Sequence, residues 1–226
     1  MKTTLIAVAL AASSLLAHAG EADVRKAVEA KLGKVEKLTK SPIGGLWEVV
    51  VEGQVLYSDD TGQYMMLGNV VDLKSGKNLT AERQFALLPL ELAMKQVRGN
   101  GKHVLVTFED PNCGYCKKLA KEIQKLDNAT VYTFLSPVLG EDSFDKSKAI
   151  WCSGNKMKAW NDWMIDAKEV GKASAKCDSA GLEKSIETGR RLRLNGTPAM
   201  FFGTGERVPG YLPAEEIQKR FVAGSL

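Results

Sequence analysis

The sequence predicts an α+β protein in which a small N-terminal α+β domain is joined by a linker helix to a C-terminal α/β domain. Residues 20–76 contain a short amphipathic helix followed by an antiparallel meander, and a helical stretch occupies residues 77–101. Residues 102–226 begin with a strand, a helix and a strand, the order typical of a βαβ unit with parallel strands. A mostly helical insertion over residues 141–194 interrupts this C-terminal domain.

Composition and charge are those of a globular protein. The 226 residues are 44% hydrophobic and 26% charged, which supplies enough apolar surface for a core and excludes intrinsic disorder. The formal net charge of +4 arises from 31 basic and 27 acidic residues that are spread along the chain. Such a small and dispersed excess gives no support for nucleic-acid binding.

The N-terminal residues have the pattern of a secretory signal peptide. Lys2 supplies the positive end, residues 5–16 the apolar stretch, and an Ala-His-Ala triplet the cleavage site, so cleavage is expected after Ala19. The apolar stretch is shorter than the ~20 residues that a membrane-spanning helix needs. We therefore expect residues 1–19 to be removed and the product to be exported as a soluble protein, without stable membrane insertion.

The N-terminal domain is predicted to consist of one helix and three or four strands. Apolar residues recur at helical spacing over 21–32, and strands bounded by turn residues follow over 46–51, 54–57 and 64–73. A segment of this size has little core of its own and is marginal as an isolated monomer. We therefore expect it to dimerise through a strand edge or a sheet face.

The linker is predicted as a helix over residues 80–97, with Thr80 as its N-cap. Pro89 lacks a backbone donor and is expected to kink this helix or split it in two. Beyond the linker, residues 103–108 and 130–135 are apolar enough to form strands buried on both faces.

The motif Cys113-Gly114-Tyr115-Cys116 lies at the start of the helix between these two strands. A helix N-terminus presents free N–H groups and partial positive charge, which stabilise a thiolate on Cys113. A thiolate attacks disulfides, and Cys116, one turn further along, is placed to attack the mixed disulfide and release the substrate. The export signal favours this redox interpretation, because disulfides persist outside the cytosol.

Three alternatives compete with redox catalysis at this motif. A permanent disulfide between Cys113 and Cys116 closes a very short loop and adds little stability. A zinc site needs a second pair of ligands, but Cys152 and Cys177 are 25 residues apart and His103 stands alone. Buried core cysteines fit poorly beside the polar neighbours of the motif. We expect neither a metal nor a cofactor.

The CGYC motif, the later Thr197-Pro198 pair and the small α+β domain with its linker helix together resemble the DsbC/DsbG family of periplasmic disulfide isomerases, a branch of the thioredoxin superfamily. From the residues alone, Pro198 is expected to be an ordinary trans proline at a strand start. The resemblance instead implies that Thr197 and Pro198 form the family's cis-proline loop. It also implies a thioredoxin-like catalytic domain over residues 102–226, with Cys113 as nucleophile and Cys116 as resolving cysteine.

The resemblance implies roles for further residues. Cys152 and Cys177 fall on the family's structural disulfide, which we expect to be buried. One thioredoxin feature is missing, because Thr107, and not an acid, stands six residues before the nucleophile. Glu109 and Asp110 are both candidates for assisting proton transfer, and the sequence does not choose between them. The substrate-binding positions that the resemblance implies are Gly114, Tyr115, Thr197 and Pro198.

The resemblance implies a thiol:disulfide isomerase that rearranges incorrect disulfides in misfolded exported proteins. Family members are homodimers joined through the N-terminal domain, here residues 20–76, and an inner-membrane partner, DsbD, keeps them reduced. Three alternatives stay open. One is a DsbG-like protector of single oxidised cysteines, another is a reductant of one dedicated client, and the third is a holdase chaperone whose cleft binds unfolded clients.

Overall fold

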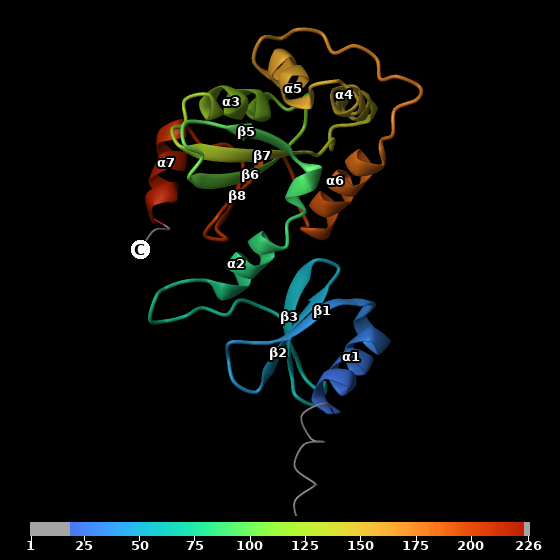
Figure 1. The fold of residues 1–226 in the computed structure, drawn as a ribbon, viewed down its shortest axis with the longest axis vertical. Coiled ribbons are helices and arrows are strands. Elements are labelled where there is room, and N and C mark those ends of the chain that lie inside the picture. Colours follow the sequence, from blue (N-terminus) through green and yellow to red (C-terminus); the bar gives the residue numbers. More distant parts are fainter. Residues whose placement is uncertain (1–18, 224–226) are drawn as a thin grey trace, which may run out of the picture. The chain divides into compact units, whose positions relative to one another are not determined.

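The computed structural model describes residues 19–223 and forms two compact units, divided after Gly68 (Figure 1). The apolar stretch of the expected signal peptide lies outside the described residues. None of the helices between residues 19 and 223 combines the length and the apolar character needed to span a bilayer.

The first unit is a helix packed on an antiparallel sheet. Val24 and Val28 of the helix are buried in one cluster with Trp47, Val49 and Val51, which alternate along a strand and so share one face of the sheet. The sheet has the strand order β1-β2-β3-β4. Its elements are α1 (Ala19–Leu32), β1 (Val35–Lys40), β2 (Leu46–Val51), β3 (Gln54–Asp59) and β4 (Met65–Met66).

A two-residue turn fixes the register of β2 against β3. Glu52 and Gly53 have φ angles of 50° and 71°, the left-handed conformation that a type I′ hairpin needs at both positions. Glycine adopts this conformation without steric cost, which explains its place in the turn. The turn sets Val51 opposite Gln54 and leaves the alternate residues of β2 facing α1.

Two strands of this unit differ from the prediction. Strand β1 was not predicted, because only Val35 and Leu38 of its six residues are buried and apolar. Of the strand predicted over 64–73, only the two residues of β4 form a strand. Beyond it, Asp72 accepts hydrogen bonds from the Lys74 backbone and the Ser75 hydroxyl, so the chain turns where the prediction extended it.

The second unit is built on a five-stranded sheet with the order β5-β7-β6-β8-β9 (Figure 1). β6 and β7 are parallel and are connected by helix α3, which confirms the predicted βαβ unit, whereas the other neighbouring strands are antiparallel. The strands are β5 (Met94–Val97), β6 (His103–Glu109), β7 (Ala129–Leu135), β8 (Ala199–Phe202) and β9 (Arg207–Pro209).

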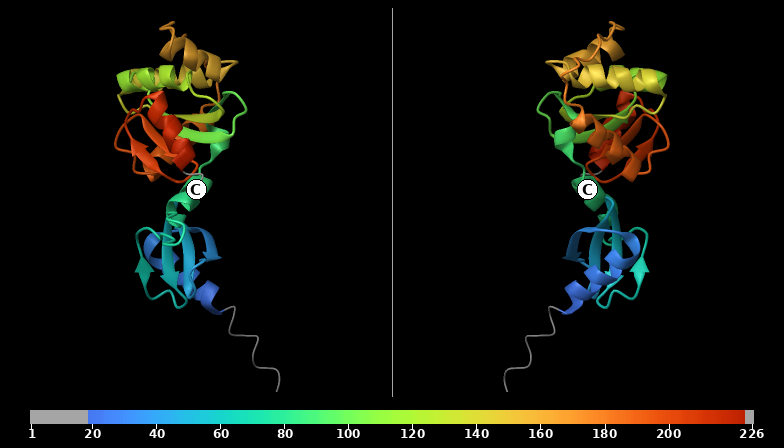
Figure 2. Two further views of the ribbon diagram at one scale, coloured as in Figure 1. Left: turned by 90° about the vertical axis from the view of Figure 1, so that its left-hand side faces the viewer. Right: turned by 90° about the vertical axis from the view of Figure 1, so that its right-hand side faces the viewer.

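Helices cover both faces of this sheet. Leu119 of α3 and Ile217 of α7, the red helix in Figures 1 and 2, share a buried cluster with Leu105 of β6. On the opposite face, Gly189 of α6 lies against Phe108. The helices are α2 (Leu79–Ala86), a 3₁₀ turn η1 (Leu90–Leu92), α3 (Gly114–Ile123), α4 (Glu141–Trp151), α5 (Lys156–Met164), α6 (Ala180–Arg191) and α7 (Ala214–Ala223).

The helix expected over residues 77–101 is present only in part. Helix α2 ends at Ala86 and Pro89 caps the 3₁₀ turn η1, so the break expected at Pro89 is confirmed. The last part of the expected helix is strand β5, which pairs with residues 130–133 of β7. Sheet pairing therefore overrides a local pattern that favours helix.

The N-cap of this segment also differs from the prediction. Asn78, and not Thr80, caps α2, because the Asn78 Oδ1 atom accepts a hydrogen bond from the Ala81 backbone at 2.9 Å. Thr80 is buried inside the first turn, where its hydroxyl accepts a hydrogen bond from the Val70 backbone at 2.8 Å.

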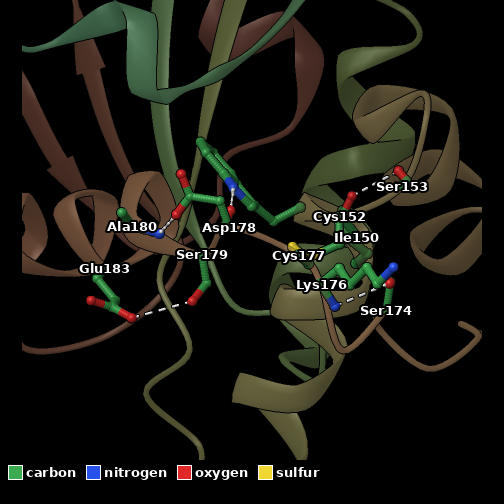
Figure 3. The surroundings of a disulfide bond; sticks show 11 residues. Ile150, Cys152, Ser153, Ser174, Lys176, Cys177, Asp178, Ser179, Ala180 and Glu183 are labelled. Carbon is green, nitrogen blue, oxygen red and sulfur yellow. Dashed lines mark hydrogen bonds between the residues drawn. A yellow bond between two sulfur atoms is a disulfide. The ribbon is translucent and has the colours of Figure 1, made fainter.

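A disulfide joins Cys152, at the end of α4, to Cys177, shortly before α6 (Figure 3). Both residues are half-buried, so the expectation of a fully buried bond is wrong. The reason is that the bond fastens an exposed connection and not a core element. Beside it, the Trp151 Nε1 atom donates to the Asp178 carbonyl at 3.2 Å, which ties the same two segments a second time.

Replacing this disulfide by Cys152→Ala with Cys177→Ala is expected to destabilise the protein by about 3.5 kcal/mol on the loop-entropy formula. The cross-linked residues are 25 apart in sequence, so the bond removes a large part of the freedom of that loop in the unfolded chain. The melting temperature should fall by roughly 10 °C. A strong reductant should lower the parent's melting temperature and leave that of the variant unchanged, and equal responses would contradict a stabilising role.

Candidate active site

The two thiols of the CGYC motif lie where strand β6 gives way to helix α3. Cys113 is the N-cap of α3, and its sulfur accepts a hydrogen bond from the Cys116 backbone N–H at 3.3 Å. Both cysteines are free thiols and both are buried. Cys113 therefore has the position at a helix N-terminus that is typical of reactive cysteines.

The proline loop lies against the same sulfur. The Thr197–Pro198 peptide bond is cis, and the Cys113 thiol donates to the Thr197 carbonyl at 3.3 Å. Pro198 is buried, and its carbonyl accepts from the Gly210 backbone at 2.8 Å, so the loop is held by the start of the β8–β9 pair. The structure thus brings together two segments that are 84 residues apart in sequence.

The middle of the motif faces solvent. Gly114 is exposed, and the Tyr115 side chain is 60% exposed, with its ring 6.4 Å from that of Tyr211. Val138 and Leu139 add further exposed apolar surface, at 52% and 60%. These exposed residues form a rim around the buried thiol pair. The rim therefore offers backbone and apolar side chains to an approaching polypeptide.

Asp110 holds these parts in place. Its Oδ2 atom accepts from the backbones of Val138 and Leu139 at 2.7 and 2.9 Å. Its Oδ1 atom accepts from the Asn112 backbone at 2.7 Å and from the Ser143 hydroxyl at 2.8 Å. Hydrogen bonds to a buried carboxylate are among the stronger ones in proteins. Asp110 therefore fixes the approach to the CGYC motif from three segments.

Trp163 of α5 also holds the loop that precedes Cys113. Its Nε1 atom donates to the Pro111 carbonyl at 2.6 Å. The amines of Lys117 and Lys146 lie 4.1 and 5.0 Å from its ring, a cation–π arrangement that holds Lys117 against the ring. The loop before the nucleophile is thus tied to α5 as well as to α3.

Glu109 is a fully buried carboxyl beneath the motif. Its Oε1 atom accepts from the Thr107 hydroxyl at 2.7 Å, whereas its Oε2 atom has no hydrogen-bond partner among the described residues. Burial raises the pKa of Glu109 to about 8, and the Thr107 hydrogen bond opposes that shift. Burial also raises the pKa of the Cys116 thiol, and the charge of Glu109 raises it further.

Comparison with known proteins agrees with this geometry. Residues 90–224 match a thioredoxin-like domain family, and residues 15–81 match the family of N-terminal domains of disulfide bond isomerase proteins. The chain is 32% identical over 219 residues to the thiol:disulfide interchange protein DsbC of Escherichia coli K12, covering 93% of this chain and 91% of that one. The chain belongs to the DsbC family.

Other disulfide interchange proteins are also similar to this chain. A probable thiol:disulfide interchange protein DsbC of Bordetella parapertussis is 44% identical over 183 residues, and the match spans 78% of this chain but only 64% of that one. A solved disulfide interchange protein from Neisseria gonorrhoeae is 35% identical with a TM-score of 0.56, covering 61% of this chain and 98% of that one.

Several residues at this DsbC-family site were not assigned a role from the sequence. Asp110 was named only as a candidate for proton transfer, although Asp-Pro-Asn is a common signal for a side chain that caps its own turn. The contacts of Trp163 and Ser143 with the loop span 52 and 33 residues, so no local pattern reveals them. Within residues 19–223, no three His, Cys, Asp or Glu side chains gather as metal ligands.

The buried Glu109 should make stability depend on pH. Its pKa is raised from 4.5 to about 8 in the folded state, so its stabilising contribution is complete below pH 4.5 and is lost as pH rises through 8. Between these limits, stability should fall by up to about 1.4 kcal/mol per pH unit. Glu109→Gln should remove this loss, as measured by urea unfolding at pH 5 and pH 8.

The matched control for that measurement is Glu169→Gln, which makes the same change at an exposed position. It should keep the pH dependence of the parent. A stability difference between Glu109→Gln and the parent that stays constant across pH would contradict a raised pKa at Glu109.

Proposed function

We propose that this chain is a thiol:disulfide isomerase that rearranges incorrect disulfides in exported proteins, with Cys113 as nucleophile and Cys116 as resolving cysteine. One observation carries this proposal. The free Cys113 thiol caps the N-terminus of α3, receives the Cys116 N–H and contacts the Thr197 carbonyl of the cis-proline loop. Membership of the DsbC family supports the same reaction.

The reaction begins when the Cys113 thiolate attacks one sulfur of a wrong disulfide. A bond forms between Cys113 and that sulfur, the client disulfide breaks, and the other client sulfur leaves as a thiolate. That thiolate can attack elsewhere in the client until Cys113 is displaced, which rearranges the disulfide without net redox change. When no client thiol is in reach, Cys116 attacks Cys113 and frees the client in reduced form.

We propose that the client polypeptide lies along the rim formed by Gly114, Tyr115, Thr197 and Pro198. Gly114 and Tyr115 are exposed, and the proline loop is in direct contact with the nucleophilic sulfur. The exposed apolar surface of Val138 and Leu139 extends this rim. Unfolded clients expose apolar side chains, which such a rim accommodates without sequence preference.

The remaining features of the proposal concern assembly and location. We infer a homodimer joined through the N-terminal domain, since residues 15–81 match the N-terminal domain of disulfide bond isomerases. The leader pattern before Ala19 supports export to the periplasm. There a membrane reductant of the DsbD type supplies the electrons that keep Cys113 and Cys116 as thiols.

The division of labour between the cysteines can be tested by refolding a scrambled ribonuclease. Cys113→Ala should reduce isomerase activity to the uncatalysed background, because nothing else attacks the client. Cys116→Ser should retain part of the activity and accumulate mixed disulfides, visible on non-reducing gels. A Cys113→Ala variant that refolds the substrate at the parental rate would contradict the proposal and leave a holdase role in its place.

A labelling experiment provides an independent check. Iodoacetamide near pH 6 should modify Cys113 well before Cys116, because burial and the Glu109 charge raise the pKa of the Cys116 thiol. Peptide mass mapping identifies the modified residue. Faster labelling of Cys116 would reverse the proposed roles.

The homodimer is testable by light scattering, which should give twice the mass of the chain at micromolar concentration. Leu67, 76% exposed at the end of the N-terminal unit, is a candidate contact, and Leu67→Glu should shift the protein toward monomer. The control is Val97→Glu, the same kind of change at an exposed apolar residue of the other unit. A monomeric parent would refute the dimer.

A further inference from the structure

Two lysines directly follow the CGYC motif, and both of their amines lie over aromatic rings. The Lys117 amine is 4.1 Å from the centre of the Trp163 ring, and the Lys118 amine is 5.0 Å from the centre of the Tyr115 ring. The negative face of an aromatic ring attracts a cation. The rings therefore restrict where these amines lie, so less side-chain freedom is lost when an anion binds to them.

Neither amine has an acidic partner within the chain. Further along the same helix, Lys125 forms an ion pair with Glu122 at 2.7 Å. No carboxylate among residues 19–223 lies within ion-pair distance of Lys117 or Lys118. An ammonium group has several N–H donors, and contact with a ring face leaves some of them available. Both lysines can therefore donate to an acceptor that the chain itself does not supply.

Helix geometry places Lys117 beside the nucleophile. Residues four apart lie on the same face of a helix, and the Lys117 backbone N–H donates to the Cys113 carbonyl at 3.0 Å. Trp163 contacts the chain on the other side of Cys113, because its Nε1 atom donates to the Pro111 carbonyl at 2.6 Å. One indole therefore binds the loop before the nucleophile through its N–H and holds Lys117 against its face.

The acidic side chain that lies against this loop is already paired. The Asp142 carboxylate forms an ion pair with Lys146, whose amine is 5.0 Å from the centre of the same Trp163 ring. It also accepts a hydrogen bond from the Asn112 side chain at 2.6 Å. Asp142 and Lys146 therefore add little net charge beside the motif, and the charge of Lys117 is not matched by them.

The two lysines lie on the side from which a client arrives. Cys116 is fully buried, so a client disulfide has to approach Cys113 over the exposed residues of the motif. Tyr115 and Lys118 are exposed there, and Lys117 is half-buried. The residues that flank the attacked client sulfur therefore come close to both amines.

We propose that Lys117 and Lys118 form a carboxylate subsite beside the nucleophile, which favours attack on client disulfides that have acidic flanking residues. The proposal rests on the isomerase function inferred above and adds a substrate preference to it. The apolar rim accommodates polypeptides of any sequence, whereas the two lysines influence which disulfide of a client Cys113 attacks first.

A matched series of small disulfides isolates the effect of charge. Dithiodipropionate, bis(hydroxyethyl) disulfide and cystamine share an ethylene arm on each sulfur and end in a carboxylate, a hydroxyl and an ammonium group. The protein is the full-length chain with Cys116→Ser. Its Cys113 thiolate attacks one sulfur of the disulfide, the other sulfur leaves as a thiolate, and the mixed disulfide persists. The mass of the protein therefore reports the first step alone.

Each rate constant is divided by that of mercaptoethanol with the same disulfide, which removes the intrinsic reactivity of the disulfide. The normalised rate should be highest for dithiodipropionate and lowest for cystamine. At a separation of about 10 Å in water, each lysine should change the ratio of these two rates about three-fold, which gives roughly ten-fold for both. At about 1 M salt, where the screening length is ~3 Å, the ratio should approach one.

Variants assign the preference to the two lysines. Lys117→Gln and Lys118→Gln should each lower the ratio about three-fold, and the double variant should bring it near one. Lys117→Arg, which keeps the charge, should retain it. Lys125→Gln is the matched control, because it removes the same charge more than two turns further along α3 and should leave the ratio unchanged. A purely structural effect on Cys113 alters all three rates by one factor and cancels in the ratio.

Three results would overturn the subsite: equal normalised rates for the anionic and the cationic disulfide at low salt, an undiminished ratio in the double variant, or an equal loss in Lys125→Gln. The first of these needs no lysine variant, so it decides the question even if the double variant does not fold. Failure of Cys113 to form a mixed disulfide with any of the three compounds would instead refute the isomerase proposal, which separates the two failures.

Discussion

The structure of the site depends on one constraint, which is that only four residues connect the end of a strand buried on both faces to the start of a helix. β6 ends at Glu109 and α3 begins at Gly114, so Cys113 occupies the N-cap and its sulfur meets the Cys116 N–H. Most of the surroundings follow from this junction. Asp110 and Trp163 hold the short loop, and the parallel pairing of β6 with β7 fixes the direction from which α3 approaches.

The same junction separates the two thiols by environment. Cys113 is 7% exposed and lies beside the proline loop. Cys116 is fully buried in the first turn of α3, where the charge of Glu109 acts on it. Burial and the charge of Glu109 therefore act against ionisation of the Cys116 sulfur, whereas the Cys113 sulfur accepts a hydrogen bond from the first turn of α3. An asymmetry of this kind suits a reaction in which one cysteine attacks the client and the other acts only when the mixed disulfide is not resolved by a client thiol.

The sequence predicted those parts of the fold that local pattern determines, and it failed where distant contacts decide. The βαβ unit and the position of the motif at a helix start follow from an apolar run, CGYC and an amphipathic segment, and the structure contains them. Residues 94–97 have a helical pattern but pair with β7, because the sheet edge offers partners that local sequence does not reveal. The unpartnered Oε2 atom of Glu109 could not be foreseen, since it depends on what surrounds Glu109 in three dimensions.

The contact between Cys113 and Thr197 has a consequence for biogenesis. The two residues are 84 apart in sequence, and Thr197 leads into β8, which must pair with β6 before the proline loop reaches the sulfur. Contacts of such long range form late, because the entropy of loop closure must be met first. A chain that emerges from its N-terminus delivers both reactive thiols before the segment that completes their site. During that interval both cysteines are present without the environment that completes their site, and they are themselves open to mispairing.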